Sequence, residues 1–145
     1  LASAKTIAMV GVSSIKEDDP LKIKRRPSTI VMKYLQEFGY RVIPVNPFSA
    51  GKKIYGETVL SKLEEIKIAI DIVDVFRPSK EAAIFTKKTF EIGAKVVWFQ
   101  YGIESEEAEK IAKSKKIIYI ANKCIKQEYQ RLFLKTSPVF PVLKN

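Results

Sequence analysis

Five short apolar runs, separated by segments of helical pattern, limit this chain to very few folds. The runs are Lys5–Val10, Tyr40–Val45, Ile68–Phe76, Lys95–Phe99 and Ile117–Ala121. Each run is short and rich in Val and Ile, which predicts a buried strand. Strands that alternate with helices form parallel sheets joined by right-handed crossovers. We therefore predict an α/β Rossmann-like fold, a doubly wound parallel five-stranded sheet in the order 3-2-1-4-5 with helices on both faces.

Helical periodicity occupies most of the intervals between these runs. Apolar residues recur at helical spacing in Ser28–Phe38, and Gly39 follows at a position where helices commonly end. Ser79 and Ser105 are candidate N-caps of two later helices. A shorter helical segment is expected over Thr58–Ile66, and a last helix follows the fifth run.

The side-chain inventory excludes several kinds of chemistry. The 145 residues suit one domain, which we expect to span 1–135, with 136–145 as a C-terminal tail. There is no histidine and one cysteine, Cys124, which excludes Ser-His-Asp and Cys-His catalysis, most histidine-based metal sites and any disulfide within the chain. No apolar run approaches the roughly 18 residues of a membrane span. We predict a cytoplasmic protein that is not an enzyme, with no catalytic residues and no metal.

The charge balance favours an anionic ligand. Lys and Arg number 26 against 16 Asp and Glu, a net charge of +10. A basic domain attracts phosphates, nucleic acid and acidic lipid, although the same lysines also serve solubility. Abundant Lys, Glu and Ile with little Asn and Gln suits a heat-adapted organism.

The segments that follow the strands form the candidate ligand site. In open α/β sheets a ligand binds beyond the carboxyl ends of the strands. Gly11 follows the first strand, where a nucleotide phosphate needs a turn with little side chain, and Ser28 lies near the start of the next helix. The loop between them carries five cations, of which Arg25 and Arg26 stand just before the helix.

The residues after the second strand suit a phosphorylated ribose. A nicotinamide-adenine site usually has Asp or Glu there to hold the ribose 2′-hydroxyl, after a G-x-G-x-x-G turn that this chain lacks. Here Asn46 and Pro47 follow the strand, and Lys52 and Lys53 come next. NADP and coenzyme A both carry a ribose phosphate, and these residues leave both open.

Ordered sequence blocks along this edge resemble a known family. The blocks are Val10–Ser13, Arg26–Ser28, Tyr34–Leu35, Gly39–Pro47, Asp71–Arg77, Gly93–Gln100 with Gly102, and Cys124–Lys126. They resemble the single-domain CoA-binding proteins, which are similar to the N-terminal domain of the succinyl-CoA synthetase α subunit and of NDP-forming acyl-CoA synthetases. The resemblance runs from about Lys5 to Leu132. The segment 11–28 is longer than is usual in this family, and Tyr129 stands near a position that often carries His.

The resemblance implies that the ligand is CoA or acyl-CoA, held at matching positions. Gly11 and Ser13 would face the phosphates, and Gln100 would line the path of the pantetheine arm. Phe76 would form part of a wall beside the adenine or the pantetheine. The full set of expected CoA-binding residues is Gly11, Val12, Ser13, Arg25, Arg26, Ser28, Asn46, Pro47, Lys52, Lys53, Phe76, Arg77, Pro78, Gln100, Gly102 and Cys124.

Three other functions remain open at this point. An NADP-dependent oxidoreductase would use a proton donor such as Tyr101. A basic nucleic-acid-binding domain would bind with steep salt dependence. A thiol enzyme would need a helix terminus or Lys123 to activate Cys124. The expected partners are a second copy of the chain or a synthetase subunit; we expect no membrane and do not favour nucleic acid.

Overall fold

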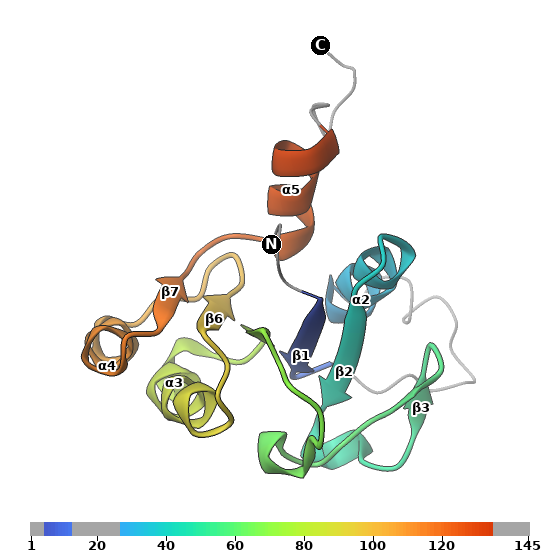
Figure 1. Ribbon diagram of the computed structural model, residues 1–145, viewed down its shortest axis with the longest axis horizontal. Helices are drawn as coiled ribbons and strands as arrows, with labels where there is room; N and C mark the ends of the chain where they lie inside the picture. Colours follow the sequence, from blue (N-terminus) through green and yellow to red (C-terminus); the bar gives the residue numbers. More distant parts are fainter. Residues whose placement is uncertain (1–4, 13–26, 135–145) are drawn as a thin grey trace.

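A parallel sheet of five strands forms the centre of the protein (Figure 1). The structure is a computed structural model and describes residues 5–12 and 27–134. The strands are β1 (Thr6–Val10), β2 (Arg41–Val45), β5 (Ile72–Val75), β6 (Val96–Phe99) and β7 (Ile118–Ile120). They lie in the order β2-β1-β5-β6-β7 and every neighbouring pair is parallel. The predicted α/β Rossmann-like fold, with its five-stranded parallel sheet, is therefore confirmed.

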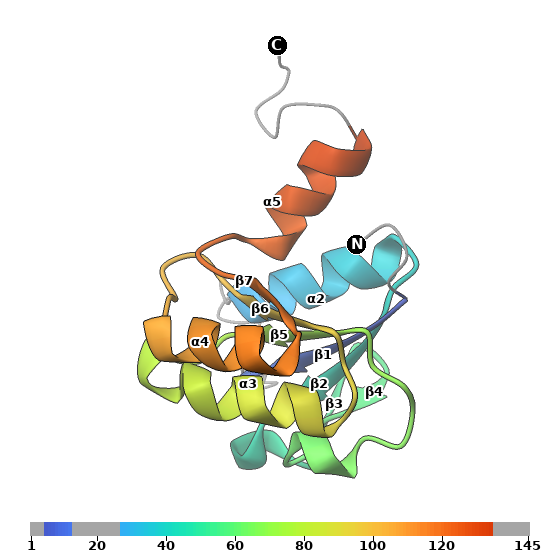
Figure 2. The ribbon, with the colours of Figure 1, turned by 60° about the vertical axis from the view of Figure 1, so that its left-hand side comes forward.

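Helices cover both faces of the sheet, as Figure 2 shows. One face carries α2 (Pro27–Glu37) and α5 (Ile125–Tyr129), which continues as a π-helical segment over Gln130–Leu134. The other face carries α3 (Ala82–Glu91) and α4 (Glu106–Lys115). The expected tail 136–145 lies outside the described residues.

The third predicted strand does not lie at its predicted position in the sheet. The strand within 68–76 is β5, which pairs with β1 inside the sheet and does not extend it beyond β2. The position beyond β2 belongs to the segment at Leu60, which bridges Val45 in parallel and exchanges backbone hydrogen bonds with Pro44 and Asn46. With this segment counted as the third strand, the order is 3-2-1-4-5, and β7 follows as a sixth. A single bridge leaves no apolar run, so the sequence could not reveal it.

Two local expectations were wrong and one was confirmed. The segment Thr58–Ile66 is not a helix: it contains the end of a small hairpin and one 3₁₀ turn. The hairpin is β3 (Lys53–Ile54) with β4 (Glu57–Thr58), and the 3₁₀ turns are η1 (Pro47–Ser49), η2 (Leu63–Glu65) and η3 (Ser79–Glu81). The Ser105 hydroxyl caps α4 by accepting from the Ala108 N–H at 3.1 Å. The Ser79 hydroxyl instead accepts from the distant Glu104 N–H at 3.2 Å.

The core consists of two clusters, one on each face. The face under α3 and α4 is apolar, with Phe99, Val73 and Val97 fully buried. The face under α2 and α5 is also apolar at Met9, Leu35 and Ile125, but aromatic side chains and buried polar groups lie beside these. Alternation along each strand places successive residues in opposite clusters.

Candidate functional site

The carboxyl ends of β1 and β5 come into close contact at Gly11. Gly11 has a φ of +88°, and a Cβ there would lie 2.7 Å from the Phe76 carbonyl oxygen and 3.0 Å from Arg77 Cδ. Its N–H donates to the Val45 carbonyl at 2.8 Å. Only glycine fits this conformation and this space. The aliphatic part of Arg77 therefore lies against the turn where phosphates are expected to bind.

Asn46 joins two of the loops at this edge. Its Nδ2 donates to the carbonyl of the fully buried Val12 at 2.8 Å, and its Oδ1 accepts from the Phe48 N–H at 2.9 Å. Both ends of the amide are thus engaged within the protein. Asn46 fixes the first loop against η1, and any contact with a ligand would be additional to these bonds.

Arg77 forms a bidentate ion pair with Glu81. The Arg77 Nε and Nη2 atoms donate to the two carboxylate oxygens at 3.1 Å and 2.8 Å. The Arg77 side chain is 40% exposed and that of Glu81 is 27% exposed. The hydrogen bonds raise the pKa of the Arg77 guanidinium and lower the pKa of the Glu81 carboxyl below its ordinary value. Pro78, beside this pair, is exposed.

A buried carboxyl group lies behind the edge. Asp74 is fully buried in β5, between Met9 of β1 and Trp98 of β6 in the sheet register. Gln100 Nε2 donates to Asp74 Oδ1, while Asp74 Oδ2 has no hydrogen-bond partner within the described structure. Burial raises the pKa of Asp74 to about 8, although the bond from Gln100 opposes the shift. The carboxyl is therefore largely protonated at neutral pH. The Gln100 amide N–H is already hydrogen-bonded to it.

Four more of the expected residues lie on separate segments that follow β2, β6 and β7. Lys52 and Lys53 are exposed, and neither is paired with a carboxylate in the part of the chain that the structure describes. Gly102 donates its N–H to Asn122 Oδ1 at 2.6 Å. Cys124 is half-buried at the N-terminus of α5.

Five other residues of the expected set differ in whether the structure describes them. Ser28 is buried in the first turn of α2, and Pro47 opens η1. Ser13, Arg25 and Arg26 lie outside the described residues. Their roles stay predictions.

One exposed aromatic ring was missed as a site residue. Phe48 follows Pro47 in η1, and 87% of its surface is exposed. The signal was an aromatic residue directly after an Asn-Pro pair in the loop that follows β2. Tyr101, in the loop after β6, is 79% exposed. Exposed rings on loops at this edge offer flat surfaces on which a base can stack.

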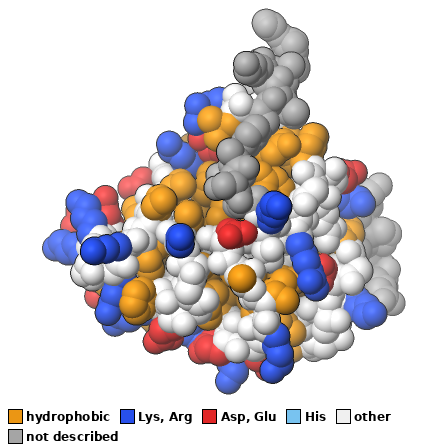
Figure 3. All heavy atoms as spheres, in the orientation of Figure 1, with side chains coloured by type: hydrophobic (Ala, Val, Ile, Leu, Met, Phe, Trp, Pro, Cys, Tyr) orange, Lys and Arg blue, Asp and Glu red, His pale blue; other side chains and the backbone are white. Residues whose placement is uncertain are grey.

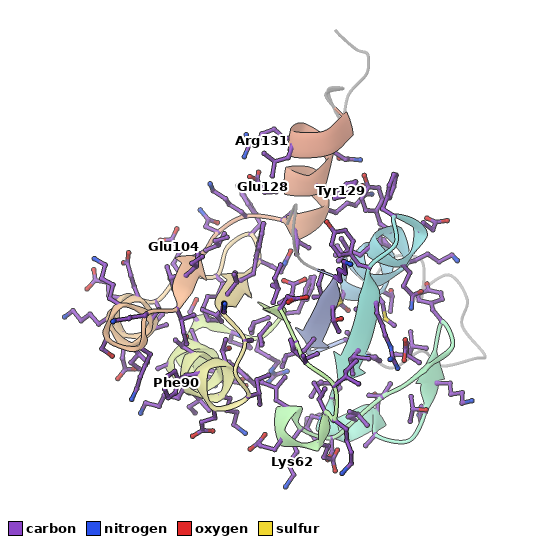
Figure 4. The ribbon with its side chains drawn as sticks, viewed as in Figure 1. Lys62, Phe90, Glu104, Glu128, Tyr129 and Arg131 are labelled. Carbon is purple, nitrogen blue, oxygen red and sulfur yellow. The ribbon has the colours of Figure 1, made fainter. Side chains whose placement is uncertain are left out.

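A cavity at the β7 end of the sheet does not suit a polyphosphate. It has a volume of about 540 Å³ and is lined by Glu104, Glu106 and Glu109 together with Tyr119 and Lys123. Glu104 lies beside β7, at the opposite end of the sheet from β2 (Figure 4). Three carboxylates would repel phosphate groups.

Basic side chains do not gather into a single patch on the face shown in Figure 3, where acidic side chains lie among them. No helix among the described residues is long and apolar enough to cross a bilayer. In the same residues, no cluster of three or more Cys, Asp or Glu side chains could hold a metal ion.

Comparison with known proteins identifies the family. Residues 5–130 match the model of the CoA-binding domain family. This chain belongs to that family. The CoA-binding domain is 37% identical over 126 residues to the uncharacterized protein YneT of Bacillus subtilis, covering 87% of this chain and 86% of YneT.

Solved structures show the same architecture for this CoA-binding domain. A Thermus thermophilus protein known as cell-free ID.343 is 38% identical, with a TM-score of 0.81, covering 91% of this chain and 92% of that one. A dinucleotide-forming acetyl-coenzyme A synthetase from Ca. Korarchaeum cryptofilum is 20% identical, with a TM-score of 0.62, covering 81% of this chain and 26% of the synthetase. The likeness to the synthetase is one of fold.

Proposed function

We propose that this protein binds coenzyme A or acyl-CoA at the carboxyl edge of its sheet, as a nucleotide-binding module without catalytic activity. The observation that carries the proposal is the Gly11 turn, with the cationic Arg77 side chain packed against it. A turn with no side chain admits the pyrophosphate of CoA, and a guanidinium beside it supplies charge and paired N–H donors. Family membership supports the same ligand.

The 3′-phosphate of CoA is proposed to bind near Lys52 and Lys53. Both lysines are exposed on the loop and hairpin that follow β2. Their charge is not neutralised by a nearby described carboxylate. The adenine would then lie near Phe48, whose exposed ring can stack on it. Pantetheine would extend toward Gln100 and Cys124.

The biological role we propose is non-catalytic. The protein would sense CoA or acyl-CoA, protect a thiol, or supply a CoA site to a partner chain such as a synthetase subunit or a second copy. The sequence has no histidine for a phosphohistidine step. A cytoplasmic location, where CoA is abundant and thiols are reduced, fits the single cysteine.

Isothermal titration calorimetry with CoA, dephospho-CoA, NADPH and a short DNA duplex tests the proposal. We expect micromolar binding of CoA and about tenfold weaker binding of dephospho-CoA, because each phosphate contact with a cation contributes about 1 kcal/mol or more. In the variant Lys52→Ala/Lys53→Ala, CoA binding should weaken to the level of dephospho-CoA, whose own affinity should barely change.

A matched control is Lys87→Ala/Lys110→Ala, which removes two exposed lysines from α3 and α4 and changes the net charge equally. This control should retain full CoA affinity. NADPH binding without CoA binding would favour the oxidoreductase, and strong salt-dependent DNA binding would favour the nucleic-acid protein. Either result would overturn the proposal, as would binding of none of these ligands.

A further inference from the structure

We propose that Glu81 is a built-in competitor for the phosphate groups of the ligand, occupying the guanidinium of Arg77 until CoA displaces it. This inference rests on the proposed function and concerns what sets the affinity of the same site. It assigns Glu81, which no sequence block singled out, as the residue that limits how tightly an anion binds.

The geometry of the pair supports this assignment. Arg77 Nε and Nη2 meet the two oxygens of Glu81 in a parallel, bidentate arrangement, at 3.1 Å and 2.8 Å. Guanidinium binds carboxylate and phosphate oxygens in the same bidentate way, through two neighbouring N–H groups. The carboxylate therefore occupies the Nε–Nη2 side of the guanidinium, to which two phosphate oxygens could otherwise bind.

The surroundings of the pair are those of an anion site. The Arg77 Cδ atom lies 3.0 Å from the position of a Cβ on Gly11. The side chain therefore passes beside the turn where phosphates are expected to bind. Glu81 itself is the N-cap residue of α3, a helix of ten residues, but its side chain makes no capping hydrogen bond. A negative charge is favoured at that end of a helix. Glu81 thus supplies the negative charge that this end of α3 and Arg77 both attract.

The pair is accessible enough to exchange partners. The side chains are 40% and 27% exposed, and four residues separate them along the chain. Exposed pairs of this kind contribute little to folding, so breaking one costs little. A ligand that carries two or more negative charges can replace the carboxylate, because it offers Arg77 the same bonds and a stronger charge.

The opposite possibility is that Glu81 holds Arg77 in position for the ligand and stays bound. The two roles predict opposite changes in CoA affinity when the charge of Glu81 is removed. If Glu81 competes, removing its charge should tighten CoA binding, since the ligand no longer breaks an ion pair. If Glu81 positions Arg77, removing its charge should weaken binding.

The test is calorimetric titration of the full chain and of Glu81→Gln with CoA and with inorganic pyrophosphate, at low salt. We expect CoA to bind about two- to fivefold more tightly to Glu81→Gln, the range that an exposed ion pair allows. Pyrophosphate, which lacks the adenosine and pantetheine contacts, should show a gain in the same direction. Glu81→Ala should behave similarly, and thermal unfolding would verify that both variants are folded.

Two further variants separate local competition from net charge. Glu64→Gln removes a carboxylate that pairs with Lys88 at 3.2 Å elsewhere on the surface and changes the net charge equally. It should leave CoA affinity unchanged. In a protein carrying Arg77→Gln, which should itself bind CoA more weakly, adding Glu81→Gln should bring no gain, because the competition has lost its target.

Weaker or unchanged CoA binding in Glu81→Gln would overturn the inference while leaving CoA binding intact. An equal gain in Glu64→Gln would also overturn it, by showing a general charge effect. Absence of CoA binding in the wild type and all variants would overturn the proposed function, and this inference with it.

Discussion

The two faces of the sheet are built differently, and neighbouring residues of β6 show how. Phe99 points into the cluster under α3 and α4, where every buried sheet residue is apolar, and packs against Tyr119 with ring centroids 5.7 Å apart. Trp98 points to the other face, where its Nε1 donates to the Lys123 carbonyl at 2.8 Å. Asp74 and Gln100 are buried near it.

This difference between the faces shows which one contains a group that lowers the stability of the fold. A fully buried carboxyl with one oxygen unpaired is costly, because burial without hydrogen bonds is unfavourable. The face under α3 and α4 contains no such group among its buried residues. Groups whose pKa is strongly shifted by burial, as that of Asp74 is, cluster at functional sites. Both faces carry an apolar cluster, but the buried Asp74 and Gln100 lie on the α2 and α5 face.

The largest expected effect comes from breaking the apolar face. Phe99→Ala should lower the free energy of unfolding by about 3–5 kcal/mol, because it removes a fully buried ring and leaves a cavity. Urea unfolding at neutral pH would measure the loss. Phe99→Leu should lose much less, since it refills most of that volume. A loss below about 1 kcal/mol for Phe99→Ala would show that this face does not carry the stability.

The next effect has the opposite sign and concerns Asp74. With its pKa raised to about 8 by burial, the folded protein keeps a proton that the unfolded chain releases near pH 4. Stability from this group is therefore fully present below about pH 4 and is lost as the pH rises toward 8. Asp74→Asn, which is neutral at every pH, should raise the free energy of unfolding at pH 7 by about 2–4 kcal/mol. Chemical denaturation between pH 5 and 9 would measure this.

Asp71→Asn supplies the control for this pH series. Asp71 is exposed and accepts hydrogen bonds from the Lys5 and Thr6 N–H groups, which lower the pKa of its carboxyl. Its stabilisation is present above the unfolded pKa and lost in acid, so Asp71→Asn should destabilise the protein at pH 7. A pH-independent difference between wild type and Asp74→Asn would contradict the protonated state of Asp74.

Long apolar elements could be predicted from the sequence, whereas short elements could not. Apolar runs predicted the five strands and both layers of helices, because a strand buried on two faces leaves a continuous run. They could not reveal the Leu60 bridge or the turns in Thr58–Ile66, since such short elements have no periodicity. For the site, loop position alone placed Gly11 and Arg77 together at one edge.

The sequence could not predict which side chains bond to one another, and the reason is a different one. Asn46 bonds to Val12, and Gln100 to Asp74, across 34 and 26 positions of the chain. Such pairs arise only when loops from different strands meet. In the sequence Asp74 is therefore only a single carboxylate within an apolar strand, and nothing marks Glu81 as the partner of Arg77, although it lies four residues away.

The smallest expected effect on stability is that of Trp98→Phe, which tests the difference between Trp98 and Phe99 within β6. Trp98→Phe removes the N–H that holds the Lys123 carbonyl and should lower the free energy of unfolding by about 1–2 kcal/mol, less than Phe99→Ala. Because Lys123 precedes the half-buried Cys124, the loop should loosen and maleimide should label the thiol faster. Tyr119→Phe is the matched control, since it removes a hydroxyl that accepts from the Ser105 N–H at 3.0 Å on the other face. That variant should leave the labelling rate of Cys124 unchanged. If both variants accelerated labelling equally, the two faces would not be independent, and Trp98 would not hold the thiol loop in place.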